Sequence, residues 1–206
     1  MSEYHPLIIG LTGSIGSGKT LITKVFKHLG VSVYLSDDEA KKLYQSREMV
    51  ERIEHLFGKE VITNNQIDKK KLANLVFNDK DSLEQLNKCI HPLVKKDFEI
   101  WTTKQTSPYV ILESAIIYEI GWESMFDKII SIFTPMNFIL ERVQQRDNQT
   151  KEHIMQRILN QLPQEEKQKR SDYVIINDNR RLVIPQIKKI HSDLLVIAKD
   201  TQRICS

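Results

Sequence analysis

One stretch near the N-terminus, Gly13–Thr20, limits what this chain can fold into more than any other. Its letters, GSIGSGKT, fit the pattern G-x-x-x-x-G-K-[ST], in which glycines allow a sharp turn and backbone N–H groups converge. The run His5–Leu11 before the loop predicts a strand. The loop is followed by apolar residues spaced as one face of a helix: Leu21, Ile22, Val25, Phe26 and Leu29. A strand, a glycine loop and a helix in this order indicate a polyphosphate site.

The chemistry of this loop points to a nucleoside triphosphate with Mg²⁺. The N-terminus of the following helix adds partial positive charge where the N–H groups converge. Lys19 is expected to reach the β- and γ-phosphates, and the Thr20 hydroxyl to ligate Mg²⁺. A glycine-rich turn with a surface lysine is the alternative, but the fixed positions and both flanking elements agree with a phosphate site. The expected nucleotide contacts are Gly13, Ser14, Ile15, Gly16, Ser17, Gly18, Lys19, Thr20 and Leu21.

Length and composition narrow the class of protein. The chain has 206 residues, enough for one sizeable α/β core. Its formal net charge of +3 is too small to imply a nucleic-acid partner by itself. No apolar run of membrane-spanning length and no leader sequence are visible, so we expect no membrane partner. Cys89 and Cys205 have no metal or redox spacing, and we expect a cytoplasmic protein in which Cys89 is buried and Cys205 lies in a frayed tail.

Apolar segments alternate with helical segments along the chain. Gly30 is expected to end the first helix, and Leu182–Lys199 to form the last one. Strands that alternate with helices predict an α/β fold with a doubly wound, mostly parallel sheet. The further strands are expected at Val31–Leu35, Tyr109–Leu112, Ile129–Phe133 and Val174–Asn177.

Two segments interrupt this alternation. Residues 38–104 are mostly helical, with an irregular or hairpin-like break at Gly58–Ile67. Within them His91-Pro92 is expected to interrupt or start a helix, because proline fits only the first turn. Asn137–Arg170 is rich in glutamine and charge. We therefore expect two helical insertions in the sheet domain, the first with helices near Asp38–Gln45 and Arg47–Phe57.

Carboxylates follow two of the predicted strands, at the edge where α/β sheets bind ligands. Asp37 is a candidate general base, since it can accept the proton of an attacking hydroxyl. Asp38 has equal local claim to that role and to capping the next helix. Glu113 either helps hold Mg²⁺, assists the base or is a solvated strand-end residue. Glu119 can equally lie on the surface of the next helix.

Cations in the second insertion suit a transferring phosphate. Arg142 and Arg146 lie four residues apart and so share one helix face. Paired guanidiniums stabilise charge that spreads over phosphate oxygens, although a solvated basic face is the commoner explanation in general. Arg157 belongs to the same segment. His91 is either a substrate contact or a structural histidine.

With these residues laid out, the chain resembles the dephospho-CoA kinase family. That family opens with a stretch close to GLTGGIGSGKS, and this chain reads GLTGSIGSGKT. The family's segment LGxxVxDADxxAR is similar to LGVSVYLSDDEAKKL at Leu29–Leu43, where its last Asp falls on Asp37 and its first on Leu35. Its Asp-x-Pro-Leu-Leu-Phe-Glu block matches Glu113–Glu119, with Ala115 in place of proline. Further matches are His91-Pro92, Arg142, Arg146-Asp147, Arg157-Ile158, Gln161 and Ser171–Asn177.

The resemblance implies a P-loop NTPase fold and a specific reaction. The family transfers the γ-phosphate of ATP to the ribose 3′-hydroxyl of dephospho-CoA, a small-molecule acceptor, in the last step of coenzyme A synthesis. It implies Asp37 as the base, Lys19, Arg142 and Arg146 as catalytic groups, and Asn177 as a nucleotide contact. His91, Glu113 and Arg157 would contact substrate, and Thr20 the Mg²⁺ ion. The core would be residues 1–37, 105–136 and 171–206, with an acceptor-binding insertion at 38–104 and a lid at 137–170.

Two other functions share the phosphate loop. A kinase for a nucleoside or nucleotide would differ mainly in the segment Ser36–Lys104. A nucleotide-dependent regulatory protein would hydrolyse slowly and use the lid to transmit a signal. Binding of dephospho-CoA distinguishes all three, because a regulatory switch binds no acceptor and a nucleoside kinase prefers the shorter ligand.

The assignment of the base to Asp37 yields a first prediction. Asp37→Asn should lower turnover by ~10²–10⁴-fold, the usual share of a general base. Asp38→Asn is the matched control and should stay close to the parent. The measurement is the steady-state rate of phosphate transfer. An inactive Asp38→Asn beside an active Asp37→Asn would move the base by one residue.

Overall fold

The computed structural model describes residues 5–77 and 79–204. They form two compact units. One, the core unit, contains the chain up to Tyr34 and from Lys104 onward; the other, the helical unit, is Leu35–Thr103. Cys205 lies outside the described residues.

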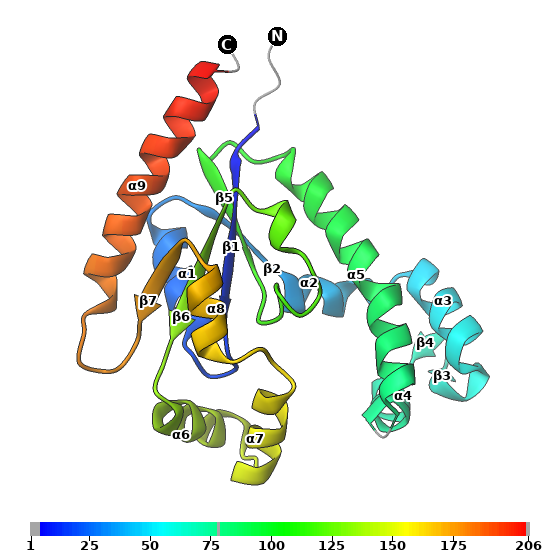
Figure 1. The fold of residues 1–206 in the computed structure, drawn as a ribbon. Helices are drawn as coiled ribbons and strands as arrows, with labels where there is room; N and C mark the ends of the chain where they lie inside the picture. The colour runs from blue at the N-terminus through cyan, green and yellow to red at the C-terminus, as the bar shows by residue number, and fades with distance from the viewer. Residues whose placement is uncertain (1–4, 78, 205–206) are drawn as a thin grey trace. The chain divides into compact units, whose positions relative to one another are not determined.

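The core unit alternates strands with helices, as its sequence predicts (Figure 1). Its strands are β1 (Leu7–Gly13), β2 (Ser32–Leu35), β5 (Tyr109–Glu113), β6 (Lys128–Phe133) and β7 (Tyr173–Ile176). Its helices are α1 (Lys19–His28), η2 (Glu123–Met125), α6 (Met136–Asp147), α7 (Lys151–Leu159), α8 (Gln164–Arg170) and α9 (Val183–Ile204).

The five strands form one sheet in the order β2-β5-β1-β6-β7. β1 pairs in parallel with β5 on one side and with β6 on the other, and β6 pairs in parallel with β7. This confirms the predicted doubly wound, mostly parallel sheet. Leu11 is in register with Glu113, and Gly13 with Ile132. The carboxyl ends of the central strands therefore meet beside the glycine loop.

The core lies between the sheet and the two helices α1 and α9. Figure 1 shows α9 along one side of the sheet and α1 behind it, with α8 in front. From Tyr109 to Leu112 every residue of β5 is 0% exposed, which confirms the prediction of a strand buried on both faces. Each fully buried aliphatic or phenyl side chain stabilises the fold by about 1.5–3 kcal/mol. The helices contribute Ile22, Phe26, Ile187, Ile190, Leu194 and Ala198 to this cluster.

The first helix ends where glycine allows it. Gly30 has φ +83°, its N–H donates to the carbonyl of Lys27, and the N–H of Val31 donates to that of Phe26. This pair of bonds is the Schellman motif, which requires a left-handed residue at its centre. The predicted helix stop at Gly30 is confirmed.

In its described residues, 35–77 and 79–103, the helical unit contains four helices and a short hairpin. Gly58–Ile67, predicted as irregular or hairpin-like, holds the 3₁₀ turn η1 and the antiparallel pair β3–β4. Its elements are α2 (Ser36–Leu43), α3 (Arg47–Phe57), η1 (Lys59–Val61), β3 (Ile62–Thr63), β4 (Gln66–Ile67), α4 (Lys69–Phe77) and α5 (Lys80–Thr102).

The prediction that His91-Pro92 interrupts or starts a helix is wrong. Pro92 lies inside α5, which continues unbroken on both sides. Proline has no N–H for the carbonyl of Lys88, and in a helix interior it costs about 3 kcal/mol. The burial of apolar side chains outweighs this cost, because each buried side chain contributes about 1.5–3 kcal/mol. A buried stripe at four-residue spacing runs past the proline: Leu86, Ile90, Val94 and Phe98.

Two further expectations concern the whole chain. Cys89 is a buried free thiol, as predicted. Among the described residues, no helix is both long enough and apolar enough to cross a membrane.

Pro92 offers a stability test. Its side chain is exposed, so Pro92→Ala removes no packing and restores the missing hydrogen bond. We expect the free energy of unfolding in urea to rise by about 2–3 kcal/mol, the helix gain less the lost rigidity of the unfolded chain. Pro108→Ala, outside any helix, is the control and should lower it by about 0.4–1 kcal/mol. An unchanged or lower value for Pro92→Ala would mean that α5 has no strain at this position.

Candidate active site

The glycine loop connects the end of β1 to α1, and its path requires glycine. Gly16 has φ +75°, and a Cβ atom there would lie 2.6 Å from Cγ2 of Val143. Gly18 has φ +96°, and a Cβ atom there would overlap the side-chain amide of Asn177. Left-handed backbone and contacts this close exclude other residues. The loop therefore packs against α6 and the end of β7 at its two middle glycines.

Two neighbouring strands hold the loop through one carbonyl group. The carbonyl oxygen of Ser17 accepts hydrogen bonds from the Thr134 hydroxyl at 2.9 Å and from Asn177 Nδ2 at 2.8 Å. Thr134 follows β6, and Asn177 follows β7. Asn177, predicted as a nucleotide contact, thus supports the loop backbone itself. The Ser17 hydroxyl is buried and, within the described part of the chain, has no hydrogen-bond partner.

Lys19 lies folded over its own loop. Its Nζ donates to the carbonyls of Gly13 at 2.9 Å and Ser14 at 3.3 Å. Glu113 Oε1 lies 3.8 Å from the same Nζ, and the two side chains are 13% and 12% exposed. Glu113 is therefore not the solvated strand-end residue considered from the sequence. The parallel register of β1 and β5 brings it to Lys19.

The arginines of the second insertion have different partners. Arg142 donates to Asn179 Oδ1 at 2.8 Å and to Asn177 Oδ1 at 3.5 Å, and its guanidinium lies over the Phe138 ring. Arg146 instead forms a bidentate pair with Asp147, at 2.6 and 2.9 Å.

Asp147 pairs with both Arg146 and Arg157, whereas the sequence predicts that Arg146 acts together with Arg142. Arg157 also donates to Asp147, at 3.2 Å. The hydrogen bond from Arg146, aided by Arg157, lowers the pKa of Asp147 to about 2. The prediction that Arg142 and Arg146 act from one helix face holds for their position on α6, but this structure directs them to different partners. A carboxylate next to Arg146 in sequence captures its guanidinium.

Apolar contacts fix the second insertion to the loop. The Ile15 side chain packs with Ile139 and Val143 of α6 and with Ile154 of α7. The backbone N–H of Ile15 donates to Gln161 Oε1 at 3.1 Å. The loop thus contacts the insertion through both the side chain and the backbone of one residue.

The base candidates lie in the helical unit. Asp37 is exposed in the first turn of α2. Asp38, the candidate cap for the next helix, does not cap α2, because the helix begins at Ser36 and its N-cap, Leu35, makes no side-chain hydrogen bond. Asp38 pairs with Lys41 at 2.8 Å. His91 lies half-buried on α5, and burial lowers its pKa, so the ring is neutral at pH 7.

Several residues of the site were missed from the sequence. Thr134 directly follows β6, and the rule that ligands gather at strand ends would have found it. Gln164 is buried and forms two hydrogen bonds with the backbone of Thr134, at 3.1 and 3.0 Å. Asn179 follows the last strand within a loop. Nothing in the sequence separates Gln164 from the other glutamines of its segment.

The donor set near the loop suits a hard cation. Thr20 is exposed at the start of α1, and the Glu113 carboxylate lies beside Lys19. Within residues 5–77 and 79–204 no group of three or more His, Cys, Asp or Glu side chains is placed to hold a metal. Mg²⁺ needs no such group, because it binds one or two protein oxygens together with phosphates and water.

Comparison with known proteins shows which family this chain is similar to. The family model described as "Dephospho-CoA kinase" matches residues 7–182. A dephospho-CoA kinase of Bacteroides fragilis is 38% identical over 88% of this chain and 90% of its own. A crystal structure from Thermus thermophilus matches with a TM-score of 0.81 at 29% identity, covering 94% of this chain and 98% of that one. A dephospho-CoA kinase from Campylobacter jejuni has a TM-score of 0.66 at 26% identity, over 94% and 98%.

Removal of the Lys19 side chain tests whether the glycine loop serves the reaction. Lys19→Ala should lower turnover by ~10²-fold or more, since it deletes a positioned charge at the reacting phosphates. Lys27→Ala, an exposed lysine in the last turn of the same helix, is the control and should keep parental turnover. Phosphate transfer from ATP measures both. Parental turnover in Lys19→Ala would show that the loop does not serve the reaction.

Proposed function

The chain belongs to the dephospho-CoA kinase family, and we propose how its residues divide the work of that reaction. The reaction is the transfer of the γ-phosphate of ATP to the 3′-hydroxyl of dephospho-CoA, the last step of coenzyme A synthesis. The observation that carries the proposal is the pairing of Lys19 with Glu113 beside a glycine loop of the required backbone shape. Three groups of residues follow from it: the loop, the strand ends and the lid.

The loop binds and orients the triphosphate. Its N–H groups and the helix dipole of α1 attract the phosphate charge. Lys19 exchanges its bonds to the carbonyls of Gly13 and Ser14 for bonds to the β- and γ-phosphates. The buried Ser17 hydroxyl supports this fit, since a phosphate oxygen would give it a partner. We also assign nucleotide contact to Asn177, which supports the carbonyl of Ser17.

A magnesium site is part of the proposal. Thr20 would hold the ion directly, and Glu113 would hold it directly or through water. When bound, Mg²⁺ neutralises charge on the β- and γ-phosphates. Glu113 also orients Lys19, because it lies 3.8 Å away at low exposure.

The arginines act from residues 137–170, which we propose as the lid. Arg142 would reach the phosphates from beside Gly18, where its Nη1 lies 3.7 Å from the position of an added Cβ atom. Arg146 would face the transferring group, and Arg157 the acceptor, while Asp147 holds both guanidiniums at a fixed spacing. Lid closure excludes water, which would otherwise compete with the acceptor hydroxyl.

The acceptor and its base belong to the first insertion in this proposal. Residues 38–104 would bind dephospho-CoA, with the neutral His91 ring as a hydrogen-bonding contact. Asp37 takes the proton of the 3′-hydroxyl as that oxygen attacks phosphorus.

A cytoplasmic location fits the buried free thiol of Cys89, because thiols stay reduced there.

The deciding experiment varies the acceptor. ADP release from Mg-ATP by the purified chain should depend on dephospho-CoA, with coenzyme A formed in equal amount. Adenosine, AMP and no acceptor are run in parallel, and Lys19→Ala serves as the inactive control. Release with adenosine or AMP alone would reassign the insertion to another substrate. Binding of ATP without release under any condition would favour a regulatory protein.

A further inference from the structure

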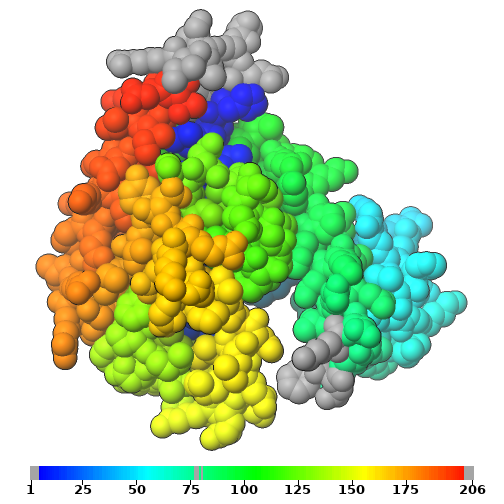
Figure 2. All heavy atoms as spheres, in the orientation of Figure 1, coloured from blue at the N-terminus to red at the C-terminus, as the bar shows by residue number. Residues whose placement is uncertain are grey.

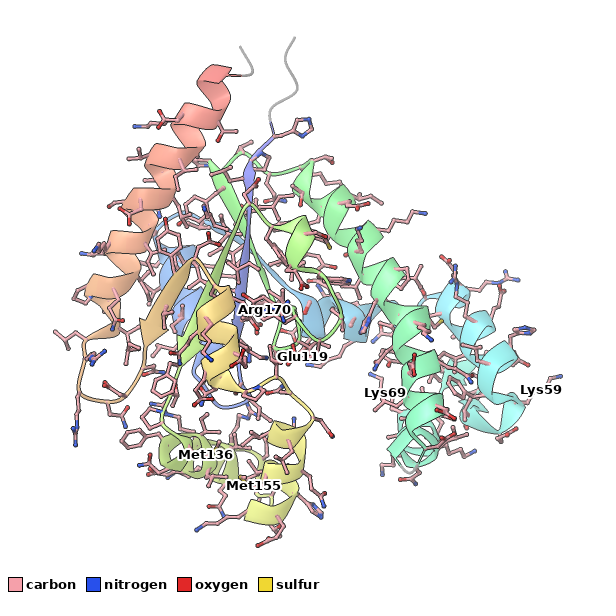
Figure 3. All side chains as sticks on the ribbon, in the orientation of Figure 1. Lys59, Lys69, Glu119, Met136, Met155 and Arg170 are labelled. Atoms are coloured by element: carbon pink, nitrogen blue, oxygen red, sulfur yellow. The ribbon has the colours of Figure 1, made fainter. Side chains whose placement is uncertain are left out.

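A buried ammonium group lies beside the active site and has no part in the proposed chemistry. Lys167 on α8 is 1% exposed, and its burial lowers its pKa. Figure 3 labels Glu119 on the segment after β5 and Arg170 at the end of α8. In Figure 2 the orange surface of α8 lies against the bright green surface of the segment after β5. Burying a cation is costly unless directed partners surround it.

Lys167 has two such partners, both on the segment that follows β5. Its Nζ donates to the carbonyl of Ala115 at 2.5 Å and pairs with Glu119 Oε1 at 2.8 Å. The same oxygen of Glu119 accepts the backbone N–H of Leu162 at 2.7 Å. One ion pair therefore joins this segment, α8 and Leu162 in the turn between α7 and α8.

The segment held by this ion pair directly follows Glu113 in the chain. Glu113 closes β5, and Ser114 comes next. The N–H of Ser114 donates to the carbonyl of Leu11 at 3.0 Å, and the carbonyl of Ala115 accepts from Lys167. The backbone just after Glu113 is thus fixed from the β1 side and from the α8 side. Glu113 in turn lies 3.8 Å from Lys19 Nζ.

We propose that Lys167 is a positioning residue for phosphoryl transfer, which fixes the segment Ser114–Glu119 and thereby the direction in which Glu113 faces Lys19. The proposal rests on the role proposed above for Glu113. A purely structural contact could be made by an apolar side chain of similar length at a lower desolvation cost. An ammonium between a carbonyl and a carboxylate instead sets the orientation of both.

The helix that carries Lys167 is itself fixed to the site. Gln164, one turn earlier on α8, is buried on the same face and bonds to the backbone of Thr134. Thr134 supports the carbonyl of Ser17 in the glycine loop. Gln164 and Lys167 lie three residues apart and so share one face of α8. One turn of this helix therefore contacts both the end of β6 and the segment after β5.

The test replaces the ammonium and keeps its volume. Lys167→Met should lower the melting temperature, because the Glu119 carboxylate and the Ala115 carbonyl lose their shared partner. At temperatures where the variant is folded its kcat should fall by ~10-fold or more, since small misplacements of reacting groups are costly. Lys169→Met is the matched control on the same helix, because Lys169 is exposed and pairs only with Glu166 among the described ion pairs. Its kcat should remain parental.

A double-mutant cycle separates positioning from packing. If Lys167 acts through Glu113, then Glu113→Gln should cost much less kcat in the Lys167→Met background than in the parent. Additive losses would overturn the proposal, as would a parental kcat in folded Lys167→Met. Should Lys167→Met fail to fold, Glu119→Gln replaces it in the cycle, since it keeps the shape and removes the charge. Turnover of the parent with dephospho-CoA tests the proposed function independently of every variant.

Discussion

The active site depends on the two hydrogen bonds to the carbonyl of Ser17. A glycine loop alone has many conformations, and the energy that selects one must come from outside it. Here Thr134 and Asn177 donate to the same oxygen from the ends of β6 and β7. Each bond contributes about 0.5–1.5 kcal/mol, and leaving this buried carbonyl unsatisfied would cost about 1–3 kcal/mol. The sheet thereby fixes the direction of the loop before any phosphate binds.

The second insertion is connected to the same loop by packing. Ile15 occupies a variable position of the motif, yet its side chain packs among residues of α6 and α7. Its N–H meets Gln161, and Gln164 bonds to Thr134 at the base of the insertion. The loop therefore shares direct contacts with the helices that carry the arginines.

Charged side chains of the site have specific partners, and the sequence patterns did not predict these partners. The spacing of Arg142 and Arg146 predicts a shared helix face, and they do lie on one helix. Their partners differ because Asp147 takes Arg146, whereas Asn179 takes Arg142. Glu113 could be read in three ways from its position after a strand. Its neighbour Lys19 comes from another strand-loop unit, and only the register of β1 with β5 brings the two together.

The sequence by itself determined the strand–loop–helix unit, the parallel sheet and the family, because these follow from local periodicity and from fixed residues at fixed spacing. It also located the Gly30 helix stop, which one left-handed residue specifies. Tertiary structure alone decided that α5 continues through Pro92, where a buried stripe outweighs a local rule. It alone placed Gln164 against Thr134 and paired the buried Lys167 with Glu119. Their partners lie on other strands and loops, and no local pattern encodes a contact between segments so distant in the chain.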